Sequence, residues 1–158
     1  MRFYLQGDHL SHFIAAFIIF NVRYSMSSKT EWMMEIKTAN TILYCRKWKE
    51  TVFFYKTQLR LQVTTSNEWF VEFKLNETSR LSIADEARTS IDSNDGKGIT
   101  ITLEVDDIEM TYLYLNEVGL NPTSIKDHAW GARVIHIYDP EGNRLEFWSS
   151  NIELDKTT

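Results

Sequence analysis

The sequence has little cysteine, little proline and fewer positive than negative charges. Its 158 residues include a single cysteine, Cys45, and two prolines. One cysteine excludes an internal disulfide and a cysteine-rich zinc site, and it is typical of a reducing compartment. Lys and Arg number 17 against 22 Asp and Glu, which gives a net charge of −5. Nucleic-acid-binding proteins meet phosphates with a basic surface, so we expect a cytoplasmic protein that binds no nucleic acid.

Long hydrophobic runs are also missing. Residues 12–20, HFIAAFIIF, are almost wholly apolar, but a helix that crosses a bilayer needs roughly 20 apolar residues. We therefore expect no membrane partner. A signal peptide would fit Arg2 and the apolar run, yet residues 25–27 match a cleavage site poorly. We predict instead that residues 1–33 form an N-terminal extension with an apolar helix, which packs on the domain or on a partner.

What the sequence does have is an ordinary hydrophobic content and many aromatic side chains. Hydrophobic residues make up 43% and charged residues 25%, the balance of a globular rather than a disordered protein. A chain of this length folds as one domain with a core of useful size. Five Trp, seven Tyr and nine Phe indicate an aromatic core or an aromatic pocket.

Two halves of the chain repeat the same order of elements: a strand, a helix and three strands. The first half is expected to have strands over 40–45, 61–65, 69–75 and 80–84 and a helix over 48–59. The second half is expected to have strands over 99–105, 122–126, 133–138 and 144–149 and a helix over 107–118. The sequence thus predicts one domain, residues 34–150, built from two tandem βαβββ modules. Their expected bounds, and that of a C-terminal tail, are 38–86, 98–150 and 151–158.

Matching residues in the two halves support this duplication. Leu43 of the first half returns as Leu103 in the second, and the pair Arg80-Leu81 returns as Arg144-Leu145. The polar segment 85–97 between the halves is typical of a loop. The spacing between matching residues differs slightly from one pair to the other, and such loops absorb the difference.

Three short segments of this duplicated unit resemble a known family. They are DPEGNRLEF at 139–147, VDD at 105–107 and FY at 54–55. These segments look like parts of the vicinal-oxygen-chelate superfamily, which includes glyoxalase I, extradiol dioxygenases, fosfomycin-resistance enzymes and bleomycin-resistance proteins. The resemblance covers roughly residues 39–150. It implies an α+β fold in which the two modules form a cup-shaped mixed-sheet barrel, here preceded by the N-terminal apolar helix.

Alternation along the strands predicts which side chains face a ligand. Leu145 and Phe147 of the last strand are expected to pack on the helix, so Glu146 and Trp148 point the opposite way. By the same rule His136 lies on the cleft side of the preceding strand. Two curved sheets enclose a cleft between their helix-free faces, which is where a ligand would bind.

The resemblance implies a metal site at four positions, in the first and last strands of each module. Carried across one by one, these positions are Asn40, Ser82, Thr100 and Glu146. Only Glu146 is a good ligand for a divalent cation, whereas a catalytic metal usually has three protein ligands and an open position. We therefore expect no cofactor, with Glu146 as the ligand if a divalent metal does bind.

His136 and Glu146 are the candidates for catalysis. A histidine beside a carboxylate can act as general acid and base on a bound substrate. The alternative is that His136 donates a hydrogen bond to Glu146 or to a backbone carbonyl, which makes a buried carboxylate tolerable.

Six aromatic residues are predicted on or near the cleft side, Tyr138 among them. Flat rings suit stacking against a planar or apolar ligand, so we expect ligand contacts from Tyr44, Trp69, Phe73, Trp130 and Trp148. The alternative is that these rings fill the cleft or form a dimer interface, where Trp and Tyr are also enriched.

Three functions remain open. We favour a metal-independent binding protein of the glyoxalase/bleomycin-resistance type that holds an apolar or aromatic molecule, with Asn40, Ser82 and Thr100 as polar contacts. Antibiotic resistance would then follow from tight binding alone. The second function is a divalent-metal-dependent lyase or dioxygenase of the same superfamily. The third is an interaction module whose cleft is filled by side chains. We expect a homodimer.

Overall fold

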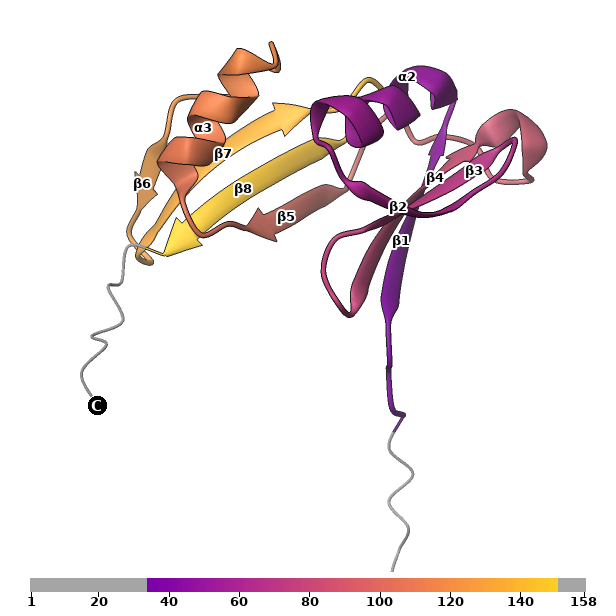
Figure 1. Cartoon of the computed structure of the whole chain (residues 1–158), viewed down its shortest axis with the longest axis horizontal. Helices are drawn as coiled ribbons and strands as arrows, with labels where there is room; N and C mark the ends of the chain where they lie inside the picture. Colours follow the sequence, from indigo (N-terminus) through magenta and orange to yellow (C-terminus); the bar gives the residue numbers. More distant parts are fainter. Residues whose placement is uncertain (1–33, 151–158) are drawn as a thin grey trace, which may run out of the picture. The chain divides into compact units, whose positions relative to one another are not determined.

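The computed structural model describes residues 34–150 (Figure 1). The predicted N-terminal extension, with its apolar helix, and the predicted C-terminal tail lie outside the described residues. The compact unit discussed below begins at Lys37.

Each module contains four strands and one main helix in the predicted order. The elements of the first module are β1 (Ala39–Cys45), α2 (Trp48–Phe53), the π-helical turn η1 (Phe54–Gln58), β2 (Gln62–Ser66), β3 (Phe70–Lys74), β4 (Ser79–Asp85) and the 3₁₀ turn η2 (Glu86–Arg88). Those of the second module are β5 (Thr100–Glu104), α3 (Ile108–Glu117), β6 (Lys126–His128), β7 (Ala132–Tyr138) and β8 (Arg144–Ser150).

The strands form two separate four-stranded mixed sheets, ordered β1-β4-β3-β2 and β5-β8-β7-β6. In both sheets the first strand of the module runs parallel to the last, and the other neighbours are antiparallel. The α+β fold of two βαβββ modules is therefore confirmed. The predicted barrel is not closed, because no strand pairing joins the two sheets within residues 34–150. A barrel requires the edge strands to pair, and here side chains connect the modules instead.

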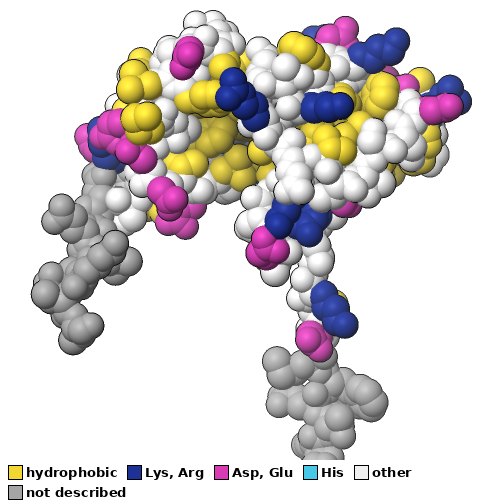
Figure 2. Space-filling view, in the orientation of Figure 1, with side chains coloured by type: hydrophobic (Ala, Val, Ile, Leu, Met, Phe, Trp, Pro, Cys, Tyr) yellow, Lys and Arg dark blue, Asp and Glu magenta, His cyan; other side chains and the backbone are white. Residues whose placement is uncertain are grey.

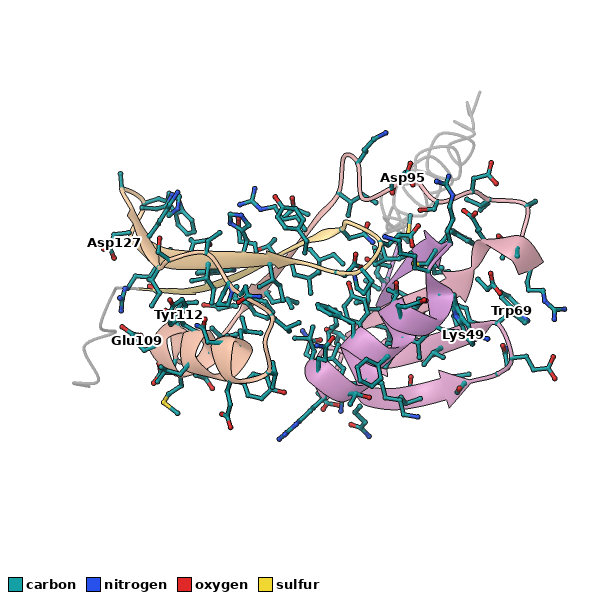
Figure 3. All side chains as sticks on the ribbon, turned by 90° about the horizontal axis from the view of Figure 1, so that it is seen from above. Lys49, Trp69, Asp95, Glu109, Tyr112 and Asp127 are labelled. Carbon is teal, nitrogen blue, oxygen red and sulfur yellow. The ribbon has the colours of Figure 1, made fainter. Side chains whose placement is uncertain are left out.

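Helix α3 lies over one face of the second sheet (Figure 1). It begins where the Asp107 carboxylate accepts a backbone N–H three residues along, at 2.9 Å, a typical N-cap. It ends before Gly119, whose φ of +78° is one that glycine adopts without steric cost. Arg133 of β7 forms ion pairs with Glu109 of α3 and Asp127 of β6, both labelled in Figure 3. The pair with Glu109 joins the helix to the sheet, and the pair with Asp127 joins two neighbouring strands.

The second strand of the second module begins later than predicted. It was expected over 122–126, but β6 covers Lys126–His128. Pro122 has no N–H to donate to a strand ladder, and Asn121 before it has a positive φ of 47°. The chain therefore turns at these two residues before it can pair with β7.

One hydrophobic core includes side chains from both modules. Phe73 belongs to it, because it is fully buried and its ring centroid lies 5.9 Å from that of Tyr55. The predicted position of Phe73 on the cleft side is therefore wrong. Strand β3 starts only at Phe70, and its alternation turns Val71 and Phe73 inward. Trp69 precedes the strand, so its orientation does not predict that of Phe73.

The turn between β7 and β8 joins the two modules. Glu141 in this turn accepts the backbone N–H groups of Arg46 and Lys47, at 3.1 and 2.9 Å, just before helix α2. The buried Tyr55 hydroxyl donates to Asp139 at 3.0 Å. A carboxylate that receives the free N–H groups at a helix start stabilises that end of the helix. The motif at 139–143 thus connects the modules within one chain.

Candidate functional site

We call the face of each sheet that carries no helix its open face. On the open face of the second sheet, His136 of β7 and Glu146 of β8 are direct cross-strand neighbours. Thr102 of β5 is paired with Glu146 on the other side. Paired side chains share one face of a sheet. A pocket of about 300 Å³ opens here, lined by Thr123, Lys126, His128, Trp130, Val134, His136, Arg144 and Glu146.

Arg144 and Glu146 form an ion pair at the floor of this pocket. Arg144 Nη2 donates to Glu146 Oε2 at 2.8 Å. Within the described residues the side chains of Glu146 and His136 share no hydrogen bond, since the carboxylate is turned to Arg144. The predicted acid–base pair is thus adjacent but not hydrogen-bonded, and its catalytic role stays a prediction.

Thr123 fixes the ring of His136. The backbone N–H of His136 donates to Thr123 Oγ1 at 3.1 Å, and that oxygen lies 3.4 Å from His136 Nδ1. The hydroxyl oxygen accepts the backbone N–H and still has one lone pair and one proton, so its contact with Nδ1 fits either ring tautomer. Burial lowers the pKa of His136, and Arg144 and Lys126 lower it further while Glu146 raises it. The lowered pKa keeps the ring mainly neutral at neutral pH.

A cluster of aromatic rings lies beside this pair. The ring centroids of Trp130 and Trp148 are 5.8 Å apart in an edge-to-face arrangement, and His128 lies 5.8 Å from Trp130. Trp130 is 61% exposed, whereas Trp148 is half-buried. Large hydrophobic side chains reach the surface elsewhere too, as the yellow areas in Figure 2 show. Trp130 thus presents an open ring at the pocket, with Trp148 behind it.

The open face of the first sheet carries a hydrogen-bonded polar network instead. Ser82 is completely buried, and its hydroxyl donates to Asn40 Oδ1 at 3.0 Å. The Asn40 amide in turn donates to Glu72 at 3.0 Å, and Thr64 donates to the other Glu72 oxygen at 2.6 Å. These four side chains link all four strands of the sheet, so the network holds the sheet together.

Tyr44 and Trp69 line a different pocket, on the first sheet. It also measures about 300 Å³, and its lining is Ile42, Tyr44, Trp69, Phe70, Ala84, Arg88, Thr89, Ser90 and Ile91. A larger cavity of about 780 Å³ lies between the β3–β4 turn and the ends of β5 and β8. Its lining contains no aromatic and no basic side chain, so it offers few groups that would hold a ligand.

The structure separates the predicted site residues into groups. Glu146, His136 and Trp130 line one pocket, and Trp148 contacts it through Trp130. Asn40 and Ser82 belong to the polar network, Tyr44 and Trp69 to the pocket on the first sheet, and Phe73 to the core. Thr100 is exposed at the start of β5, paired with Arg144.

Sequence reasoning missed two residues whose positions the repeat could have indicated. Glu72 lies opposite Ser82, as His136 lies opposite Glu146. The same number of residues separates Glu72 from His136, Ser82 from Glu146 and Arg80 from Arg144. Applying that offset to His136 would have found Glu72, and applying it to Arg80 points to Arg144 in the pocket.

The residues at the four metal positions that the family resemblance implies do not fit a catalytic divalent cation. Asn40 and Ser82 are bonded to each other, and the Glu146 carboxylate is paired with Arg144. Within residues 34–150 no three His, Cys, Asp or Glu side chains lie close enough to hold a metal ion. A catalytic metal needs about three such ligands.

Comparison with known proteins agrees with this fold. Residues 38–152 match the family model of the glyoxalase-like domain. The chain belongs to this glyoxalase-like family. The resemblance to the vicinal-oxygen-chelate superfamily is thereby confirmed. Within the described part of this glyoxalase-like protein, no helix is long and apolar enough to cross a membrane.

Three relatives of this glyoxalase-like chain illustrate the family. The uncharacterised YraH of Bacillus subtilis (strain 168) is 29% identical over 119 residues, covering 67% of this chain and 92% of YraH. A glyoxalase/bleomycin resistance protein/dioxygenase from Nocardioides is 19% identical with a TM-score of 0.65, over 89% of this chain and 98% of its own. TnmS3, an antibiotic binding protein from Streptomyces sp. CB03234, is 16% identical with a TM-score of 0.60, over 75% and 98%. The two solved structures show the fold alone, because one fold serves many functions.

Proposed function

We propose that this chain binds a small aromatic or apolar molecule in the pocket on the open face of its second sheet, and that no metal ion takes part. The pocket itself carries the proposal: a polar floor of His136 and Glu146 beside the exposed ring of Trp130. Ligand sites combine apolar or aromatic walls with a few placed polar groups, and they begin at about 300 Å³. The volume here suits a small ligand.

The role of each predicted residue follows from its pocket. Trp130 stacks on the ligand, and Trp148 holds Trp130 in place through their edge contact. Thr100 lies next to Arg144 and is a polar contact at the edge. Tyr44 and Trp69 line a pocket on the other sheet, so a ligand on the second sheet does not touch them.

The name of one structural neighbour supports a binding function. One solved protein of this fold, TnmS3, is described as an antibiotic binding protein. Tight binding alone would let this chain sequester a toxic compound. We further propose that the chain does so as a homodimer, which light scattering at several protein concentrations would test.

The test is a screen of small aromatic and aliphatic molecules by thermal shift, because a ligand of the folded state raises the unfolding midpoint. Hits are then titrated into Trp130→Ala and Trp148→Ala. We expect each variant to bind about tenfold more weakly, since both remove aromatic contacts. Trp69→Ala on the first sheet is the matched control and should bind like the wild type. Equal affinity in all three variants would overturn the proposal.

Metal analysis separates this proposal from the metal-dependent enzyme. Untagged protein is purified without chelator and titrated with Ni, Zn, Mn and Fe(II) by calorimetry. We expect no stoichiometric binding by the wild type. Near-stoichiometric metal that is lost in Glu146→Ala would contradict metal independence and favour a lyase or dioxygenase.

A further inference from the structure

The pocket on the second sheet is more positive than the protein around it. Its lining has Lys126 and Arg144 against a single carboxylate, Glu146, together with His128 and His136. The whole chain has a net charge of −5. A cleft lined mainly by one sign of charge attracts ligands of the other sign. A positive pocket in an acidic protein therefore favours an anion.

Several donors in this pocket have no acceptor among the described residues. Arg144 Nε is shielded from solvent and makes no hydrogen bond within residues 34–150. Lys126 forms no ion pair in that part of the chain. His136 lines the same pocket, and its ring nitrogen Nδ1 faces Thr123. A buried donor without an acceptor, such as Arg144 Nε, raises the free energy of the folded state, and an anion would supply the acceptor.

The equivalent arginine of the first module uses its guanidinium to bond the backbone. Arg80 is the counterpart of Arg144 in the repeat, and its Nη1 donates to the carbonyl oxygens of Asn76 and Ser79, at 2.6 and 3.0 Å. That guanidinium holds the β3–β4 turn. The equivalent residue in the second module lines a pocket instead.

We propose that the pocket recognises an aromatic carboxylate, with the carboxylate between Arg144, Lys126 and His136 and the ring against Trp130. This inference rests on the proposed function and names the class of its ligand. A guanidinium binds a carboxylate through two parallel hydrogen bonds, for which Arg144 turns Nε toward the ligand. His136 is a further donor when its ring proton is on Nε2.

The carboxylate of Glu146 does not prevent this arrangement. It is already paired with Arg144 at 2.8 Å, which compensates its charge. Lys126 then adds a positive charge that no carboxylate of the described residues pairs with. Burial chiefly lowers the pKa of His136, and the charges of Arg144 and Lys126 lower it further while Glu146 raises it. An incoming anion is therefore favoured despite Glu146.

Three naphthalenes of equal ring size test the charge preference. Titrations use 1-naphthoate, 1-naphthalenemethanol and 1-naphthylmethylamine, which carry a negative, a neutral and a positive group, with affinities measured by calorimetry at low salt. We expect the carboxylate to bind about tenfold more tightly than the alcohol, and the amine most weakly. Raising the salt to about 0.5 M should shrink the preference, because exposed charges are screened.

Two variants locate the preference on the second sheet. Lys126→Met and Arg144→Gln should each remove most of the preference for naphthoate over the alcohol. Arg80→Gln in the first module is the matched control and should keep the full preference. Circular dichroism confirms that each variant folds, and the exposed Lys126 gives a variant in which a loss of folding is not expected.

The outcomes distinguish this inference from the proposed function. Equal binding of naphthoate and the alcohol, or tighter binding of the amine, would overturn the inference and leave the binding function standing. A preference that survives both Lys126→Met and Arg144→Gln would overturn the assigned residues. If none of the three compounds binds at millimolar concentration, both the inference and the proposed function fail for aromatic ligands.

Discussion

The two modules share one topology but use equivalent positions in opposite ways. In the first, Arg80 donates to backbone carbonyls and Glu72 accepts from two neighbouring side chains. In the second, Arg144 and His136 occupy the matching positions and line a pocket. On the first open face the polar side chains bond to one another, whereas on the second Arg144 Nε has no acceptor among the described residues.

This difference shows what a duplicated fold makes possible. When two modules share one core, either can lose polar groups that it would otherwise need to hold its own sheet together. Here the first sheet keeps a network across all four strands, ending at the buried Ser82. The second sheet has a carboxylate, Glu146, at the position of Ser82. The fold is common to many functions, and the site determines which one is present.

The largest expected effect tests whether the modules fold as one unit. Leu81 and Leu145 are equivalent in the repeat, and both are fully buried. We expect Leu81→Ala and Leu145→Ala each to lower the free energy of unfolding by about 2–5 kcal/mol, the usual cost of a buried Leu to Ala change. Urea unfolding followed by circular dichroism and by Trp fluorescence should show one shared transition in both variants. Two separate transitions would show that the modules are independent.

The next effect concerns the turn that joins the modules. Glu141→Gln keeps one acceptor oxygen but places an amide NH₂ where a backbone N–H now donates. We expect a loss of about 1–3 kcal/mol in the free energy of unfolding at pH 7, because a buried donor is left unpaired. Glu77→Gln is the control, since Glu77 is exposed, and it should not change the midpoint in urea. An unchanged urea midpoint in Glu141→Gln would show that the turn between the modules does not stabilise the fold.

Glu141 also makes the stability of the folded protein depend on pH. Burial alone would raise the pKa of Glu141, but hydrogen bonds from Ser93 and from the N–H groups of Lys47 and Arg46 lower it below its usual 4.5. A carboxylate with a lowered pKa stabilises the fold above its unfolded pKa, and this stability is lost as the pH falls through the folded pKa. Burial raises the pKa of the neighbouring Asp139, which acts with the opposite sign.

Comparing wild type with Glu141→Gln isolates that contribution. The stability difference between the two proteins should be constant from pH 7 to about 5.5 and should shrink below pH 4.5, the usual value for this carboxyl. Urea titrations at each pH measure it. A difference that grows as the pH falls would mean that the pKa of Glu141 is raised in the folded protein.

The smallest effect separates the two open faces. Glu72→Gln removes the charge from a hydrogen-bonded network and should lower the free energy of unfolding by about 0.5–1.5 kcal/mol, without changing the affinity for naphthoate. Glu146→Gln should instead change binding: naphthoate should bind a few-fold more tightly, because a negative charge near the ligand is lost. A stronger effect of Glu72→Gln on binding would place the ligand on the first sheet.

The sequence predicted the duplication and most strand positions, because alternation and the repeated Arg-Leu pair are local signals. It did not predict the late start of β6, which depends on the turn at Asn121 and Pro122. Nor did it predict that Phe73 lies in the core, where the alternation of β3 places Val71 and Phe73 inward.

Within the candidate site, alternation along β7 and β8 could place His136 and Glu146, whereas Trp130 lies in the turn before β7. The ion pair of Arg144 with Glu146 could not be predicted in this way, because it depends on side-chain rotamers. Nor could the sequence show that Asn40 and Ser82 bond to each other, since that contact joins two strands far apart in the chain.

One measurement tests the central claim that the second open face binds the ligand and the first supports the fold. Two-dimensional NMR spectra of ¹⁵N-labelled protein are recorded during a titration with 1-naphthoate. We predict shifts of the backbone amide signals of Thr123, Lys126, Trp130 and His136, with those of Asn40, Glu72 and Ser82 unmoved. Shifts confined to the first sheet would contradict the account.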